Sequence, residues 1–168
     1  MRSLVERVIS QKDNRGLMSD LRCALVKGKE HRSWPALHRL GVSLSEDITC
    51  KLDALVVGLF ATHPEVTSDG NFGETCNSIW KRRDSGTSED KIGPTERRFQ
   101  HLLAAERNEI GDRIIRFVQM AKAEGVPINY DQLLKDLRYW GPKIRRKWAD
   151  SFWSIKSEHS STDVEKIS

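Results

Sequence analysis

A wide apolar helical face lies in the stretch Ser45-Glu46-Asp47-Ile48-Thr49-Cys50-Lys51-Leu52-Asp53-Ala54-Leu55-Val56-Val57-Gly58-Leu59-Phe60. Its apolar residues recur at intervals of three and four, the period of an α-helix: Ile48, Leu52, Leu55, Val56, Leu59 and Phe60. Ser45 can cap this helix, and the two acidic residues after it suit the positive end of the helix dipole. His63-Pro64 ends it. So wide a face is typical of a helix buried in a bundle core.

The same period continues on both sides, and apolar and polar residues nowhere alternate long enough for a convincing strand. Cap and stop residues divide the chain into helical segments. The expected segments are Ser3 to about Gln11, Ser19 to Gly28, a short helix capped by Ser33 in which Trp34 packs inward, Ser45 to His63, Asn71 to Trp80, a helix opened by Pro94, a helix capped by Asn108 and closed by Gly125, Asn129 to Gly141, and a last helix opened by Pro142. A continuous helix from Pro94 to Ala123 is the alternative to a break near Asn108. The sequence therefore predicts an all-α fold, a compact bundle of roughly eight helices with no sheet.

The length of 168 residues suits one domain, or two small lobes that share a core. Residues 81–93 have almost nothing to bury and are expected to form a polar loop. We therefore expect residues 1–93 to form an N-terminal helical lobe that ends in this loop. Residues 94–156 are expected to form a C-terminal helical bundle, and residues 157–168, which lack an apolar face, a flexible tail.

The net charge of +4 is unevenly distributed along the chain. Residues 1–90 contain 13 Lys or Arg and 13 Asp or Glu, whereas residues 91–156 contain 14 basic and 8 acidic residues. The last twelve residues carry a net charge of −2. A positive field confined to one segment suggests nucleic acid as the first partner to consider, with a solvated helix surface as the simpler alternative.

The densest basic cluster lies between two tryptophans, in Trp140-Gly141-Pro142-Lys143-Ile144-Arg145-Arg146-Lys147-Trp148. Pro142 suits the first position of a helix, in which Ile144 and Trp148 belong to a buried stripe. At about 100° per residue, Lys143, Arg146 and Lys147 then lie on the opposite face and Arg145 on its flank. Cations in the first turns of a helix oppose its dipole, so local stability does not explain them, whereas a bound polyanion would.

Two further basic groups accompany this cluster: Arg97 and Arg98 at the start of the Pro94 helix, and Lys81, Arg82 and Arg83 before the polar loop. A helix N-terminus offers free N–H groups to phosphate, and arginine adds forked contacts. The tryptophans near the cluster could stack on bases, but their helical spacing favours the core. With no motif that reads bases, the chain is typical of a helical, sequence-independent polyanion binder.

Signatures of catalysis are missing from the sequence. It contains no phosphate-binding Gly-rich loop, no dinucleotide fingerprint and no His-Glu-x-x-His pair, and its three cysteines, Cys23, Cys50 and Cys76, form no Cys-x-x-Cys motif. We therefore expect no enzymatic activity, no metal or other cofactor and no small-molecule substrate. No apolar run approaches the roughly 20 residues of a membrane span, and the first residues do not resemble a signal peptide, so a cytoplasmic protein is expected.

Three stretches in the second half resemble a known family: Glu96-Arg97-Arg98-Phe99-x-x-Leu102-Leu103-x-Ala105-x-Arg107, Ile128-Asn129-Tyr130-Asp131-x-Leu133-Leu134-x-Asp136-Leu137-x-x-Trp140, and Arg146-x-Trp148-Ala149-x-x-Phe152. Looser similarity precedes them in Leu21-Arg22-Cys23-Ala24, Pro35-Ala36-Leu37-x-Arg39-Leu40 and Leu59-Phe60-Ala61. Together they cover most of residues 19–156 and resemble the CasB family, the small subunit of Cascade, the type I-E CRISPR surveillance complex. One departure is Asn129-Tyr130, where the family often carries Asp-Trp; it affects a helix cap and a packing aromatic.

This resemblance implies a non-catalytic, all-helical subunit of a prokaryotic antiviral complex. It implies partners that include other Cascade subunits, a second copy of the chain, the crRNA and the target DNA with its displaced strand. It also implies that the subunit stabilises the R-loop through backbone contacts, since base pairing with the guide reads the sequence. The candidate nucleic-acid-binding residues are Arg22, Arg97, Arg98, Lys143, Arg145, Arg146 and Lys147. The alternative is a structural spacer subunit whose basic face contacts partner proteins.

Overall fold

The computed structural model describes residues 1–86, 88 and 90–165, and the side-chain burial of these as far as Trp153. Over this part the protein is all-α, with nine α-helices, two short 3-10 helices and no strand, as predicted. The elements are α1 (Leu4–Ile9), α2 (Arg15–Arg22), η1 (Cys23–Leu25), η2 (Glu30–Ser33), α3 (Trp34–Arg39), α4 (Ile48–Thr62), α5 (Phe72–Arg83), α6 (Pro94–Leu103), α7 (Ile110–Glu124), α8 (Tyr130–Arg138) and α9 (Pro142–Glu165).

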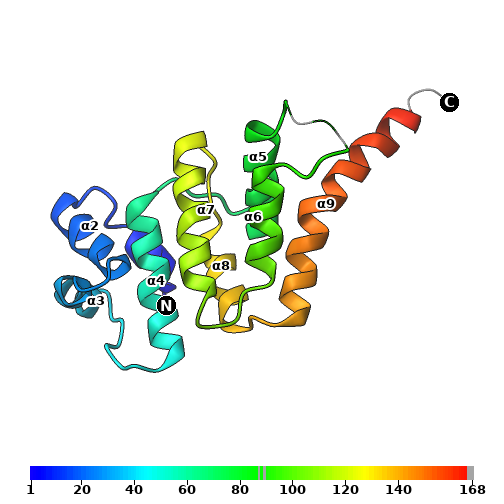
Figure 1. Ribbon diagram of the computed structural model, residues 1–168. Coiled ribbons are helices and arrows are strands. Elements are labelled where there is room, and N and C mark those ends of the chain that lie inside the picture. Colours follow the sequence, from blue (N-terminus) through cyan, green and yellow to red (C-terminus); the bar gives the residue numbers. More distant parts are fainter. Residues whose placement is uncertain (87, 89, 166–168) are drawn as a thin grey trace.

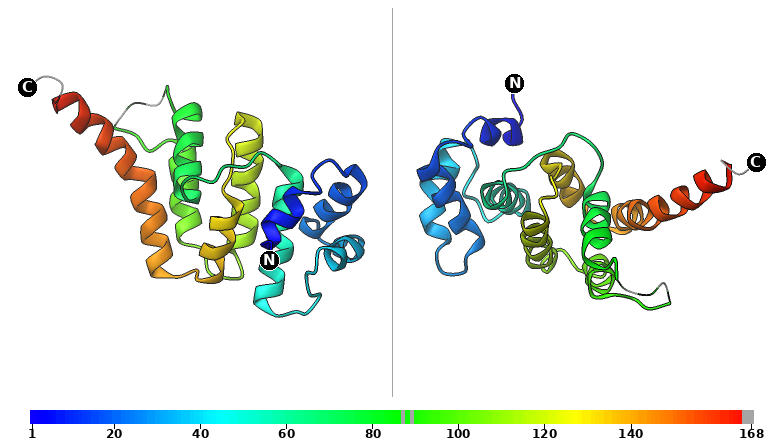
Figure 2. Two further views of the ribbon diagram at one scale, coloured as in Figure 1. Left: turned by 180° about the vertical axis from the view of Figure 1, so that it is seen from behind. Right: turned by 90° about the horizontal axis from the view of Figure 1, so that it is seen from above.

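The helices stand in a row whose order differs from that of the sequence (Figure 1). The small helices α1 to α3 lie at one end, where α3 packs on α2 while α1 and α2 pack on α4, and α4 packs in turn on α7 and α8. Helices α5 and α6 come next, and α9 closes the opposite end, as the view from above also shows (Figure 2). The first and last helices therefore lie at opposite ends of the molecule.

Helix α4 is buried between the N-terminal helices on one side and α7 and α8 on the other, as its apolar pattern predicts. Val56, Val57, Leu59 and Phe60 are completely buried, while Ile48 at its start is exposed. The buried apolar residues form a single cluster that includes residues from α1 to α9. Helix α5 precedes residue 93, yet it packs against α6, α7 and α9, which follow it. The hydrophobic core therefore has no break at the predicted lobe boundary.

Several predicted helix ends are confirmed by their caps. Ser3 and Glu6 form a capping box, and the side chains of Asn71 and Asn129 accept hydrogen bonds from the third helical residue of α5 and α8. Gly125 ends α7 with a left-handed φ of 68°, which a residue with a Cβ rarely adopts. The local sequence was sufficient to predict these helix ends, because each capping partner lies within four residues of the cap.

Other predicted caps are wrong. Ser19 lies inside α2, which Asn14 caps instead through its side chain. Helix α4 begins at Ile48, after Asp47, and not at Ser45. Ser33 precedes α3 but makes no capping bond, because its hydroxyl donates to the carbonyl of Glu30 at 2.6 Å. Near Ser19 and Ser45 several Ser, Asp or Asn residues compete for the cap, and local sequence does not decide among them.

The polar segments differ from the prediction in two further respects. Helix α5 continues to Arg83, so the first residues of the expected loop are helical. Helix α9 continues to Glu165, past residue 156, where the sequence predicts the tail to begin. No glycine or proline follows Pro142, so the sequence carries no strong signal to stop this helix. Residues 166–168 of the expected tail lie outside the described residues.

Candidate nucleic-acid interface

The start of α9 is anchored by the two tryptophans that flank the basic cluster. Both are buried, and their rings lie 4.9 Å apart between centroids. The indole N–H of Trp140 donates to the carbonyl of Ala105 at 2.9 Å, and that of Trp148 donates to the buried carboxylate of Asp136 at 2.8 Å. The tryptophans are therefore core residues and do not present their faces to bases.

The outer face of this helix carries Lys143, Arg146 and Lys147, which we call the α9 cationic face. All three side chains are exposed, whereas Ile144 between them is buried. None of the three makes an ion pair or a side-chain hydrogen bond with the part of the chain that the structure describes. No acidic residue lies in the first turn of α9 to compensate them. The predicted division of the helix into buried and basic faces is confirmed.

Arg145 differs from its neighbours because its guanidinium group already contacts other residues of the protein. Its Nη2 donates to the carbonyl of Ala105 at 2.7 Å and lies 3.8 Å from Glu106. Its guanidinium carbon lies 5.5 Å from the centre of the Trp140 ring. These contacts tie the start of α9 to the end of α6, so Arg145 is arranged as a structural residue more than as a free ligand.

Arg97 and Arg98 lie on the first turns of α6 and are both exposed. Arg98 reaches toward the sulfur of Met120 on α7 at 3.7 Å. The neighbouring Glu96 instead accepts a hydrogen bond from the indole N–H of Trp153 at 3.0 Å. Phe99 stacks on Phe152 with ring centroids 4.0 Å apart. These contacts place the start of α6 beside the middle of α9.

The structure does not bring all the candidate residues into one site. Since α6 meets α9 near Trp153, its arginines are displaced from Arg146 by about 10 Å along α9, at about 1.5 Å per residue. Arg22 ends α2, at the opposite end of the molecule from α9 (Figure 1). The candidates therefore form one compact group on α9, a second group nearby on α6, and a distant single residue.

The basic group before the polar loop has an internal role. Arg82 donates to the backbone carbonyl of Glu124, and Arg83 forms an ion pair with the Glu124 carboxylate at 3.1 Å. Both contacts lie at the C-terminus of α7, where carbonyl groups have no helical partner. These two arginines thus complete a helix end, whereas Lys81 makes no such contact with the residues that the structure describes.

Buried titratable groups belong to the core. The hydroxyl of Tyr130 donates to the carbonyls of His63 and Leu59, and burial, together with the charge of Glu65, raises its pKa. Burial likewise raises the pKa of the Cys76 thiol. Within the described residues no three His, Cys, Asp or Glu side chains lie close enough to hold a metal ion, and no helix is both long and apolar enough to span a membrane.

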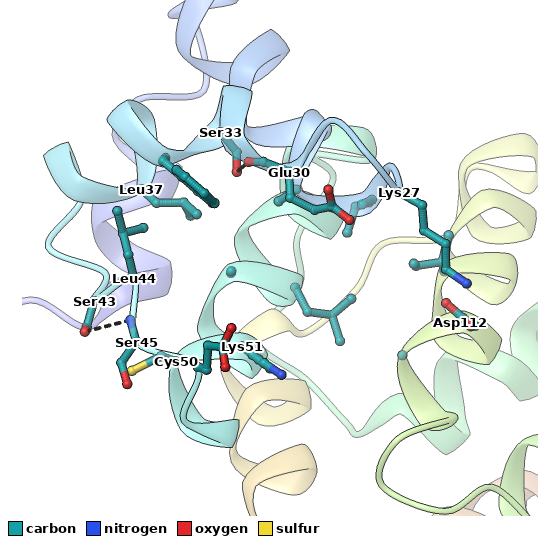
Figure 3. Close-up of a pocket in the computed structure, with 18 residues that line it drawn as sticks. Lys27, Glu30, Ser33, Leu37, Ser43, Leu44, Ser45, Cys50, Lys51 and Asp112 are labelled. Carbon is teal, nitrogen blue, oxygen red and sulfur yellow. Dashed lines mark hydrogen bonds between the residues drawn. The ribbon is translucent and has the colours of Figure 1, made fainter.

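An apolar hollow of about 670 Å³ lies between the N-terminal helices, α4 and α7 (Figure 3). Trp34 and Leu44 line it and are half exposed, at 50% and 48%. Leu37 lines its inner side, while charged side chains stand at its edge, among them Lys27, Glu30, Lys51 and Asp112. The sequence predicted Trp34 to be packed inside, so this surface was missed; a short helix has too few turns to fix which face is buried.

Comparison with known proteins identifies the family. The family model for the CRISPR-associated protein Cse2 matches residues 18–153. The chain belongs to the Cse2 family. The matched range agrees closely with the residues that resemble CasB, and it includes the α9 cationic face and the helices that anchor it. Among proteins of curated function none matches the sequence.

Solved structures show the same fold as this Cse2-family chain. CasB from M. ruber is 20% identical, with a TM-score of 0.69 over 95% of this chain and 98% of that one. A Cse2-family CRISPR-associated protein from Thermus thermophilus is 21% identical, with a TM-score of 0.70 over 90% and 94%. A second structure from that organism, of CasB, is 20% identical, with a TM-score of 0.66 over 91% and 99%. At this identity the likeness concerns the fold alone.

Proposed function

We propose that this Cse2-family chain is the non-catalytic small subunit of a type I-E Cascade complex. In this role it binds nucleic-acid backbone without sequence preference and stabilises the R-loop, including the displaced strand and the crRNA–target duplex. Its partners are the other Cascade subunits, a second copy of itself, the crRNA and the target DNA, in the cytoplasm of a prokaryote. Family membership supports the complex, and the α9 cationic face supports the contact with nucleic acid.

The observation that carries the proposal is the uncompensated charge on α9. Lys143, Arg146 and Lys147 stand in the first turns, where the positive end of the helix dipole already disfavours them. Each is exposed and unpaired among the described residues. A phosphate backbone supplies the missing negative charge, and such contacts position a ligand without reading its bases.

The anchoring of the helix adds to this argument. Trp148 and Phe152 hold the inner face of α9 in the core, so the cations on the outer face project from a fixed helix. A binding surface on a rigid element loses less conformational entropy when a ligand binds. The α9 cationic face can therefore bind an extended nucleic-acid strand. The face is small, and the arginines of α6 lie nearby as a separate group.

The test is charge reversal of Lys143→Glu together with Arg146→Glu in the full chain. We expect affinity for a single-stranded DNA oligonucleotide to fall at least tenfold, and the slope of log affinity against log salt to shrink by about 0.7 for each phosphate that the variant no longer neutralises. The free energy of unfolding should hold or rise, because acidic residues suit the start of a helix. Fluorescence anisotropy over a salt series and chemical denaturation measure the two quantities.

The matched control is Lys29→Glu with Arg32→Glu, which removes the same net charge from two exposed cations of the N-terminal helices. If this control weakens DNA binding as much as the α9 variant does, only total charge matters and the site is wrong. Equal affinity of the α9 variant and the wild type would also contradict the proposal. Sequence independence requires similar affinities for oligonucleotides of different sequence at one salt concentration.

A second candidate function is a structural subunit that acts through contacts with partner proteins. The apolar hollow favours it, since an exposed tryptophan and leucine beside a concave surface are typical of protein interfaces. The two roles are compatible, because the hollow and the α9 cationic face lie at different ends of the molecule. They are distinguished by R-loop lifetime in an assembled complex, which the α9 substitutions should shorten only if that face binds nucleic acid.

A further inference from the structure

A second basic concavity lies at the end of the molecule opposite to α9. Three arginines line a hollow of about 420 Å³ between α1, α2 and α3: Arg2, Arg7 and Arg39. The remaining lining residues are Ser10, Gln11, Leu17 and Leu40, and none of the seven is acidic. The volume is within the range of roughly 300–1,000 Å³ that is usual for small-ligand sites. We call this hollow the arginine pocket.

Arg7 is held in place by the fold. Its Nε donates to the carbonyl of Leu40 at 3.1 Å and its Nη1 to the carbonyl of Arg2 at 2.9 Å. Through Leu40 it joins the end of α1 to the end of α3, and it is only partly exposed. Its Nη2 makes no hydrogen bond with the described residues. One fixed guanidinium therefore faces the pocket with donors to spare.

The positive charge of the pocket has no internal partner. Arg2 and Arg39 are exposed, and none of the three arginines forms an ion pair within the described part of the chain. Three like charges around one hollow repel each other, and an anion removes that cost. The Ser10 hydroxyl already donates to the carbonyl of Arg7 at 2.6 Å, so the side-chain donors left for a ligand are the guanidinium groups and the amide of Gln11. These donors match an oxyanion with several acceptor oxygens.

We propose that the arginine pocket binds a phosphate group, either of a nucleic-acid backbone or of a small phosphorylated ligand. The pocket goes beyond the proposed function, because Arg2 and Arg7 precede residue 18, where the family match begins. It is also independent of the α9 cationic face, from which the whole row of helices separates it (Figures 1 and 2). Arginine suits this role, since its planar fork contacts two phosphate oxygens at once.

The experiment measures thermal unfolding of the full chain with inorganic pyrophosphate. We expect the ligand to raise Tm by roughly 5–10 °C at about one hundred times its Kd. Arg39→Glu and, separately, Arg2→Glu should abolish this rise, while neither should change Tm without ligand by more than a few degrees, because both side chains are exposed. Arg7 is left intact, since its backbone contacts give it a structural role. Arg32→Glu, an exposed arginine outside the pocket, is the matched control and should retain the rise.

A single-stranded DNA oligonucleotide identifies the source of the phosphate. If the backbone is the ligand, Arg39→Glu lowers affinity about tenfold, as removal of a charge-assisted hydrogen bond predicts. If DNA affinity is unchanged while the pyrophosphate effect disappears, the pocket stands and takes a small phosphorylated ligand. The proposed pocket is wrong if pyrophosphate does not raise the Tm of the wild type and both pocket variants bind DNA with unchanged affinity. This result would not affect the test of the α9 cationic face, so failure of one proposal can be distinguished from failure of the other.

Discussion

Asp136 is a buried residue of α8 that helps to hold the helix bearing the α9 cationic face. Its carboxylate accepts from the indole N–H of Trp148 at 2.8 Å and from the side-chain amide of Gln132 at 2.9 Å. Both oxygens thus have a partner inside the core, as burial of a charged group requires. The bond to Trp148 and the burial of Ile144 and Phe152 hold the same face of α9 against the core, and Lys143 and Arg146 lie on the opposite face.

Tyr130 provides a test of core chemistry at the residue scale. Burial raises its pKa, and burial also raises that of Cys76, so the folded protein retains protons that the unfolded chain releases above about pH 8.5–10. The stability from both groups is therefore complete below that range and is lost as pH rises above it. We expect the free energy of unfolding to fall between about pH 9 and 11, and to fall less steeply in Tyr130→Phe.

The same substitution has a cost at neutral pH. It removes the hydroxyl that donates to the carbonyls of His63 and Leu59, which should lower the free energy of unfolding by about 1–3 kcal/mol. Tyr139→Phe is the control, because Tyr139 is 77% exposed and should change neither the value nor its pH dependence. Denaturant titrations across the pH range give both results, and parallel curves for wild type and Tyr130→Phe would refute the assignment.

At the scale of elements, the close contact between α5 and α9 holds in place the helix that bears the α9 cationic face. A Cβ at Gly73 would lie only 2.3 Å from the backbone oxygen of Trp148, so the two helix backbones meet where Gly73 leaves room. Phe152 stacks on Trp80 from the same pair of helices, with centroids 4.6 Å apart. The contact needs glycine for its small size, since Gly73 has ordinary helical backbone angles.

Gly73→Ala tests this contact. The added methyl would push against main chain and not against a mobile side chain, so we expect the free energy of unfolding to fall by at least about 1–3 kcal/mol. Gly16→Ala is the matched control: a Cβ there meets no atom closer than 3.8 Å, and alanine in a helix gains up to about 1 kcal/mol over glycine. Opposite signs for the two substitutions in chemical denaturation support the account, and a stable Gly73→Ala variant would contradict it.

At the scale of the whole molecule, the row of helices separates the α9 cationic face from two surfaces near the N-terminal end. Helix α9 closes one end of the row (Figure 1), whereas the arginine pocket and the apolar hollow (Figure 3) are both lined by α3 near the other end. An elongated subunit of this kind can contact a backbone along its length and a protein partner on its side. Substitutions in the α9 cationic face should therefore have effects that add to those of substitutions in either N-terminal surface, because sites more than about 10 Å apart rarely couple.

The hollow yields a prediction for the assembled complex. We expect Trp34→Ser to leave the fold intact, since half of the side chain is already exposed, but to reduce recovery of the chain with the products of neighbouring genes in co-purification. Ile92→Ser is the control, with a similar exposure of 48% outside the hollow. Equal recovery of both variants would remove the hollow from the protein interface.

Much of the fold follows from local patterns. Apolar spacing predicts the helices, Asn71, Asn129 and Gly125 bound three of them, and the face of α9 that carries Lys143 and Arg146 follows from the helical repeat. These features depend on residues within a few positions of each other, so sequence alone is sufficient. The family resemblance could also be found from the sequence alone, because it rests on short motifs.

Only the tertiary structure decided which basic residues are free. Arg145 and Arg83 resemble Arg146 in sequence, yet one contacts Ala105 and Glu106 and the other Glu124, partners about 40 positions away. The arginine pocket likewise joins Arg2 and Arg7 to a residue more than thirty positions later. Chain segments this distant meet only after the core has packed, so the sequence determined which residues are charged and on which helix face, whereas long-range packing determined which charges remain for a ligand.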